Sequence, residues 1–116
     1  MFCANVWVGS ITVTRTQIRG SYQYVINGEI YVENQSHNKL VGIHYEVGGN
    51  WHDLTAHYSH SLLTAGGNRI EVWTVNDSFY SSSMNSTVRL AAYYHNLDLG
   101  VSCWDNNGGG DYTVPI

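Results

Sequence analysis

Tryptophan side chains that lie next to amide and carboxylate side chains are the residues of this sequence best suited to chemistry with a ligand. Trp51 follows the turn-like segment Gly48-Gly49-Asn50, and Trp104 precedes Asp105-Asn106-Asn107. A flat indole ring offers an apolar surface to the C–H face of a sugar, and each amide supplies both a donor and an acceptor for hydroxyl groups. These residues indicate a surface for a neutral polar ligand. The alternative is that the two rings close the ends of a core.

The composition supports a neutral ligand and argues against other partners. Only 12% of the 116 residues are charged, whereas ordinary soluble domains have about 25%. With five Lys and Arg and a formal net charge of −4, the chain lacks the basic patch that phosphate neutralisation requires. No apolar run approaches the ~18 residues of a membrane-spanning helix. We therefore expect no nucleic-acid partner and no membrane partner.

The length predicts one domain, residues 1–116, built around a single core. Residues 1–5 have neither a basic start nor a continuous apolar stretch, so no signal peptide is visible. The chain is therefore expected to be either cytoplasmic or a mature secreted form. A bridge between Cys3 and Cys103 and two free buried thiols are both consistent with the sequence. The sequence leaves the oligomeric state open.

Alternation of apolar and polar residues predicts the secondary structure. In residues 41–47 the odd positions are apolar and the even ones small or polar, which predicts a half-buried strand. Asn27-Gly28, between two such runs, predicts a two-residue type I′ hairpin turn. Further strands are expected at residues 11–14, 22–26, 29–33, 54–58, 69–75, 88–94 and 100–104. About eight short strands without helical periodicity predict an all-β, antiparallel sandwich.

The same alternation predicts which aromatic rings face away from the core. If Cys103 points inward, Trp104 points to the opposite face of its strand. If Leu90, Ala92 and Tyr94 are core residues, Tyr93 points outward. A cluster of such rings would mark a binding surface, whereas scattered exposed aromatic residues are ordinary.

An ordered set of fragments spanning residues 10–114 resembles carbohydrate-binding module family 21, the starch- and glycogen-binding type. Each fragment is weak by itself, but the order and the closing aromatic-Asp-Asn-Asn stretch are specific. The fragments are Tyr31-Val32-Glu33-Asn34, Lys39, 41–45, Asn50-Trp51, 56–59, 71–74, Trp104-Asp105-Asn106-Asn107 and Asp111-Tyr112.

The resemblance implies an immunoglobulin-like β-sandwich that binds α-1,4-linked glucans, with neither catalysis nor a cofactor, at up to two sites. In the first site, Trp51 and Trp104 match the stacking aromatic residues, with Asn106 and Asn107 as hydroxyl partners. The family's third aromatic residue aligns with Ala91, and Tyr93 is a substitute two residues further on the same face. Asp111 stands where the family has an asparagine.

The second site implied by the resemblance departs from the family pattern. Asn34, Lys39, Tyr58 and Glu71 match positions that the family uses. Two further positions that are aromatic in the family are His37 and Ile70 here. These departures, with the glycine-rich run before Asp111, leave open a different sugar specificity.

Catalysis and metal binding fit the sequence less well. Glycoside hydrolysis needs two carboxylates about 5–9.5 Å apart across a cleft. Asp53, Asp105 and Asp111 are the candidates, but Asp105 is expected to accept backbone N–H groups of a turn. His57 and His60 are expected to face opposite sides of a strand, which is poor metal-ligand geometry, and the acidic residues do not follow the EF-hand spacing. We therefore expect neither an enzyme nor a metal site.

Two other functions stay open beside starch or glycogen binding. One is a free-standing lectin that recognises different glycans on the same scaffold. The other is an immunoglobulin-like protein-interaction domain whose aromatic patch contacts a protein. For a solvent-exposed sugar site, the dissociation constant is expected to be roughly micromolar to millimolar.

Overall fold

The computed structural model describes residues 6–33, 39–82, 84, 87–98, 100–105 and 110–116, in which nine β-strands form two antiparallel sheets. The four-stranded sheet has the order β1-β2-β6-β5, and the five-stranded sheet has the order β4-β3-β7-β8, with β9 also paired to β7. The strands are β1 Val6–Ile18, β2 Ser21–Glu33, β3 Lys39–Val47, β4 Asn50–Thr55, β5 His57–Leu63, β6 Arg69–Ser81, β7 Thr87–Asn96, β8 Val101–Asp105 and β9 Tyr112–Pro115.

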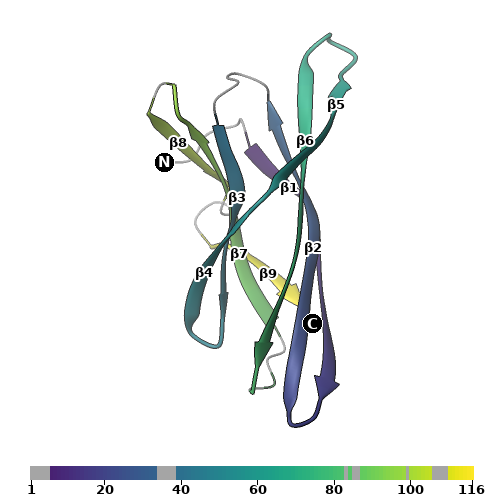
Figure 1. Cartoon of the computed structure of the whole chain (residues 1–116). Helices are drawn as coiled ribbons and strands as arrows, with labels where there is room; N and C mark the ends of the chain where they lie inside the picture. Colours follow the sequence, from purple (N-terminus) through teal and green to yellow (C-terminus); the bar gives the residue numbers. More distant parts are fainter. Residues whose placement is uncertain (1–5, 34–38, 83, 85–86, 99, 106–109) are drawn as a thin grey trace.

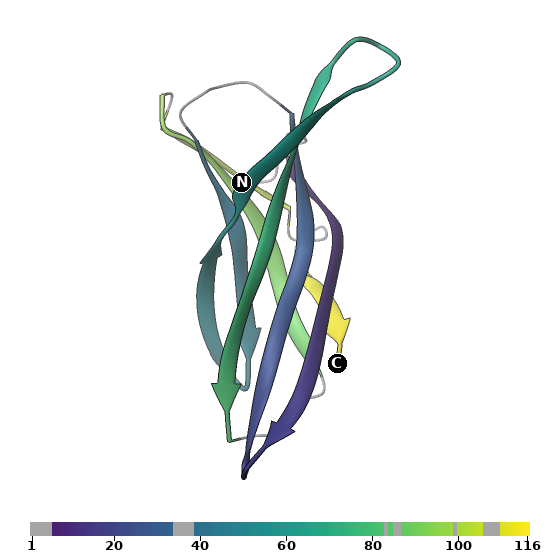
Figure 2. The same cartoon turned by 45° about the vertical axis from the view of Figure 1, so that its right-hand side comes forward.

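The two sheets lie in separate layers, and the β5–β6 hairpin projects from one end of the sandwich (Figures 1 and 2). The strand orders correspond to the ABED and C′CFG sheets of immunoglobulin domains. This confirms the predicted antiparallel, immunoglobulin-like sandwich. In the described residues, nine strands replace the expected eight or so. The predicted strands at 22–26 and 29–33 are one strand, the predicted strand at 54–58 is divided between two, and β9 was not predicted.

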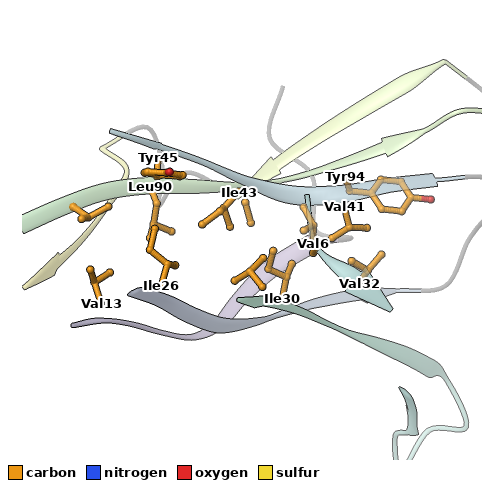
Figure 3. Close-up of a cluster of buried hydrophobic side chains, with 14 of the residues drawn as sticks. Val6, Val13, Ile26, Ile30, Val32, Val41, Ile43, Tyr45, Leu90 and Tyr94 are labelled. Atoms are coloured by element: carbon orange, nitrogen blue, oxygen red, sulfur yellow. The ribbon is translucent and has the colours of Figure 1, made fainter. Parts of the chain in front are cut away.

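The core lies between the sheets and is built from the alternating positions that the sequence predicted. Figure 3 shows Ile26 and Ile30 of one layer pointing toward Leu90 and Ile43 of the other. Burying each such side chain contributes roughly 1.5–3 kcal/mol, which holds the two layers together. The described hydrophobic residues with 0% of their surface exposed are Tyr24, Ile26, Ile30, Val32, Val41, Ile43, Val88, Leu90 and Ala92.

The prediction of a hairpin turn at Asn27-Gly28 is wrong. Strand β2 runs without interruption through both residues, and the turn lies at Arg19-Gly20, where the two φ angles are 40° and 82°. Positive φ at both central positions is the requirement of a type I′ turn. At Gly28 an added Cβ would lie 2.5 Å from the backbone carbonyl oxygen of Ser10 and would also collide with the Ile11 side chain of β1, so glycine is needed there for close packing of neighbouring strands.

The prediction of one strand over residues 54–58 is also wrong, because the chain changes sheets at Ala56. Strand β4 ends at Thr55 in the five-stranded sheet, and β5 begins at His57 in the four-stranded sheet. Between them, the N–H of Ala56 donates to the carbonyl of Val41 at 2.8 Å, and Ala56 is buried.

His57 and His60 do not face opposite sides of β5, contrary to the sequence prediction. A register shift between Tyr58 and His60 places His57 opposite Thr74 and His60 opposite Val72. Residues two apart on β6 share a face, so both imidazoles lie on the same face of the four-stranded sheet.

Two further features involve residues of β8. Cys103 is disulfide-bonded, and the other cysteine of the sequence, Cys3, lies outside the described residues. Asp105 is buried and accepts the backbone N–H of Val8 at 2.9 Å, which joins β8 to β1 of the other sheet. Asp105 therefore accepts a backbone N–H from strand β1, while residues 106–109 of the turn expected after it lie outside the described residues. In the described part of the chain, no helix is long and apolar enough to cross a membrane.

Candidate functional site

The outer face of the five-stranded sheet carries a cluster of five rings, which we call the aromatic platform: His44, Trp51, Tyr93, His95 and Trp104. The inward positions of the same strands, such as Tyr45, Tyr94 and Cys103, belong to the core. Their neighbours in sequence must therefore point outward. Strand register then brings residues from β3, β4, β7 and β8 together, with Tyr93 directly opposite Trp104.

The rings of the platform form two stacked pairs joined by Trp104. His44 lies parallel to Trp51, with centroids 4.7 Å apart and planes at 10°, and Tyr93 stacks on His95 at 4.8 Å and 25°. Trp104 meets Tyr93 at 5.6 Å and turns its plane by 80° from His44 and 75° from His95. The Trp51 indole, parallel to His44, is therefore close to perpendicular to the Trp104 indole.

Trp51 is the most open ring of this set, with 42% of its surface exposed, and Trp104 is half-buried. Trp51 is the second residue of β4, directly after the Gly48-Gly49 turn, where both φ angles are positive. A carboxylate oxygen of Glu46 accepts the N–H of Gly49 at 3.0 Å and fixes that turn. Neither indole plugs the interior, so the alternative of rings that close the core does not describe them.

Tyr93 faces outward as predicted, but its ring is covered, with only 8% exposed. Gly42 of β3 makes room for it, because a Cβ on Gly42 would lie 2.5 Å from the Tyr93 hydroxyl oxygen and would also meet the carbonyl oxygen of Leu54. Burial raises the pKa of the Tyr93 hydroxyl, and a hydrogen bond with Thr55 partly offsets that rise. Tyr93 therefore supports Trp104 and offers a ligand little surface of its own.

Hydrogen-bonding groups surround the platform. A groove of about 370 Å³ is lined by Leu40, His44, Asp53, Tyr93, His95 and Trp104. Nδ1 of His44 lies 2.7 Å from Oδ1 of Asp53, and Nδ1 of His95 lies 2.7 Å from the Ser102 hydroxyl. The Asp53 side chain is 71% exposed, so its second oxygen can accept from a ligand hydroxyl.

Arg89 connects the platform to Asp111. Its guanidinium donates to Asp111 at 2.9 Å and lies 3.6 Å from Glu46, and its central carbon is 5.7 Å from the Trp51 ring centroid. Asp111, expected from the family resemblance as a site residue, thus lies one ion pair away from Trp51. The carboxylate charge of Asp111 is balanced by Arg89 instead of being open to solvent.

The residues expected for a second site meet in a different way. Lys39 and Glu71 form an ion pair with Nζ–Oε1 2.7 Å, and their side chains are only 4% and 11% exposed. The same Glu71 oxygen accepts the indole N–H of Trp73 at 3.0 Å, and Trp73 meets the exposed Tyr58 ring edge-on at 5.8 Å. Because β3 and β6 belong to different sheets, the Lys39–Glu71 pair links the two layers and presents little surface to a ligand.

Three side chains of the platform region were not predicted from the sequence. His44, His95 and Arg89 follow the outward alternation of β3 and β7, which is the signal that could have found them. The pairing of these strands, needed to bring them beside Trp51 and Trp104, is not visible in sequence. Asn34, Asn106 and Asn107, also expected at sugar sites, lie outside the described residues.

Comparisons with known proteins support the fold. No protein-family pattern and no curated protein matches the sequence. Among solved structures, the chain is similar to the solution structure of the carbohydrate binding module of the muscle glycogen-targeting subunit of Protein Phosphatase-1, with a TM-score of 0.51 and 21% identity. The match covers 96% of this chain and 75% of that one. At this identity the likeness shows the shared β-sandwich fold.

Proposed function

We propose that this protein is a non-catalytic carbohydrate-binding domain whose aromatic platform binds α-1,4-linked glucans such as starch or glycogen. The observation that carries the proposal is the exposed Trp51 indole beside a near-perpendicular Trp104 indole, on an open sheet face with hydrogen-bonding groups around it. The fold likeness to a glycogen-targeting subunit's carbohydrate binding module supports the same class of ligand. The ordered fragments that resemble family 21 also support it.

The angle between the two indoles favours a curved glucan over a flat one. An α-1,4-linked chain turns from one sugar to the next, whereas a β-1,4-linked chain forms a flat ribbon. The Trp51 indole lies nearly parallel to the His44 ring, and the Trp104 indole lies nearly perpendicular to that same ring. Successive sugars of a curved chain can therefore contact rings of different orientation, while Asp53 and His95 provide hydrogen-bonding atoms beside them.

The carboxylates near the platform are not arranged for hydrolysis. Asp105 is buried and accepts the Tyr112 hydroxyl and the Val8 N–H, while Asp111 is held by Arg89. Asp53 alone of the three candidate carboxylates is open to solvent. Glycosidases need a pair of carboxylates across a cleft, one of them able to act as an acid. A binding role therefore fits these residues better than a catalytic one.

Affinity measurements on two variants test the proposal. Trp51→Ala and Trp104→Ala are each expected to weaken maltoheptaose binding at the platform at least about ten-fold, because central aromatic contacts dominate such surfaces. Tyr80→Ala is the matched control, since Tyr80 is 66% exposed and lies on β6 of the other sheet. Unchanged affinity in both tryptophan variants, with the fold intact by circular dichroism, would remove the assignment. Binding to other glycans on an array, without binding to starch, would favour the lectin alternative.

A further inference from the structure

The outer face of the four-stranded sheet carries a second groove, on the side of the molecule opposite the aromatic platform. Its volume is about 400 Å³, and polar side chains from β1, β2 and β6 form most of its lining. We call it the amide groove. Its polar lining residues are Ser10, Thr12, Asn27, Glu29, Thr74 and Asn76.

Strand register arranges these residues as two parallel rows. Ser10, Glu29 and Thr74 lie opposite one another across β1, β2 and β6. Two residues further along β2, a second row contains Thr12, Asn27 and Asn76. Neighbouring strands are about 4.8 Å apart, and same-face positions along a strand about 6.7 Å apart. The rows therefore present a regular grid of hydroxyl, amide and carboxylate groups.

The centre of the amide groove is a pair of amides that keeps hydrogen-bonding capacity for a ligand. The Asn76 side-chain N–H donates to the Asn27 side-chain oxygen at 2.6 Å. This bond leaves the Asn27 amide nitrogen as a donor and the Asn76 amide oxygen as an acceptor. One oxygen of Glu29 accepts the Tyr31 hydroxyl at 3.1 Å, so the other can accept from a ligand hydroxyl. A donor and an acceptor side by side suit neighbouring hydroxyls of a sugar.

Aromatic rings stand at one end of the amide groove. Trp7 lies directly opposite Tyr31, in the row next to Glu29, with ring centroids 5.9 Å apart and planes at 47°. Trp7 is the second residue of the edge strand β1 and is 36% exposed. An exposed indole beside free amide and hydroxyl groups is the same combination that forms the aromatic platform.

The chemistry of the amide groove selects the class of ligand. Glu29 is the only ionised side chain among its lining residues, which disfavours an anion. Serine is depleted in protein–protein interfaces relative to the rest of the surface, and the core of such interfaces is more apolar than this lining. A neutral polyhydroxylated ligand matches both the hydrogen-bonding grid and the ring.

We propose that the amide groove, with Trp7 and Tyr31 at its end, is a second oligosaccharide site, so that the domain binds glucan on both outer faces. This inference rests on the proposed function of the platform. Because the two sites lie on opposite sheets, one molecule can hold two glucan segments. Simultaneous engagement then raises retention on a polysaccharide above the affinity of either site.

The four tryptophans of the sequence make the test direct, because together they report on three different places. The indole N–H signals of the ¹⁵N-labelled full chain are followed by NMR during titration with maltoheptaose. Trp51 and Trp104 report on the platform, Trp7 on the amide groove, and Trp73 is an internal reference because its N–H is bonded to Glu71. Bacterial expression keeps Asn76 free of the glycan that the sequence Asn76-Asp77-Ser78 accepts in a secretory compartment.

The expected result is two independent binding curves. The Trp7 signal shifts during the titration. The dissociation constant obtained from that shift changes by no more than about two-fold in the Trp51→Ala/Trp104→Ala double variant. Asn76→Ala, at an exposed position, raises the dissociation constant measured at Trp7 about five-fold, which is the effect of one lost hydrogen bond. The Trp51 curve stays unchanged in that variant. Gln17→Ala, an exposed polar control on the same sheet, leaves both curves unchanged.

Three outcomes would overturn one proposal or the other. If the Trp51 and Trp104 signals shift and the Trp7 signal does not, the second site is wrong and the platform remains the glucan site. If the Trp7 signal shifts and the Trp51 and Trp104 signals do not, the platform is not the glucan site and the amide groove is supported. A Trp7 shift whose affinity Asn76→Ala does not change overturns the assignment to the amide groove.

Discussion

Replacing Lys39 by methionine should destabilise the fold strongly while leaving glucan binding intact. The Lys39 ammonium lies 2.7 Å from Glu71, and both side chains are almost inaccessible to water. Methionine keeps most of the length of the side chain and removes the charge. The Glu71 carboxylate would then be buried without its partner, since its remaining bond from Trp73 is a single indole N–H.

The size of this effect follows from the cost of leaving a charge buried and unpaired. Breaking a buried ion pair from one side typically costs about 3–5 kcal/mol, whereas replacing both partners is often close to neutral. We therefore expect Lys39→Met to lower the free energy of unfolding by about 3–5 kcal/mol. The double variant Lys39→Met/Glu71→Gln should recover at least about half of that loss. Its glutamine keeps an acceptor for the Trp73 N–H.

Urea unfolding followed by tryptophan fluorescence measures these free energies, and the four proteins of the double-mutant cycle isolate the pair. Arg69→Met is the control, because Arg69 is exposed and its loss should change stability by no more than about 0.5 kcal/mol. A loss below about 1 kcal/mol in Lys39→Met, together with weakened maltoheptaose binding, would refute this reasoning. It would show Lys39 to be a ligand contact, as the family resemblance implies.

Three further perturbations test other parts of the structure. Gly42→Ala should lower the free energy of unfolding, measured by thermal unfolding, by about 1–3 kcal/mol, because the new Cβ must displace the Tyr93 ring. Since Tyr93 packs beneath Trp104, the same variant should also weaken maltoheptaose binding. Unchanged binding would contradict the role of Tyr93 as a support for Trp104. Burial, with the hydrogen bond to Asp105, raises the pKa of Tyr112 from near 10 to about 12. The contribution of the neutral Tyr112 hydroxyl to the free energy of unfolding is therefore complete below pH 10 and is lost as the pH rises through about 12. In Tyr112→Phe, unfolding curves taken across that pH range should not show this loss. Reducing the Cys103 disulfide should lower the free energy of unfolding by about 4–5 kcal/mol if it closes the loop to Cys3, whereas a reductant should not change Cys103→Ser.

The fold was largely predictable from sequence, because its main signals are local. The alternation in residues 41–47 and 88–94 identified strands β3 and β7 and most of their core residues. The Gly48-Gly49 turn was also predicted correctly, since the positive φ angles there suit glycine. Local reasoning failed at Asn27-Gly28, where the glycine serves the approach of β1 instead of a turn. It failed again at Ala56, where the change of sheet depends on packing between the layers.

Sequence by itself determined the side of the sheet that each ring takes, because the two-residue period is a property of the extended backbone. It therefore predicted that Trp104 and Tyr93 face away from the core, whereas Trp51 was singled out by the turn that precedes it. Tertiary structure alone decided what stands beside each of them, because the pairing between strands is set by packing across the whole sandwich. Because of that pairing, His44 stacks on Trp51 and the Tyr93 ring packs over Gly42. The packing of the two sheets also brings Lys39 and Glu71 together as a buried ion pair.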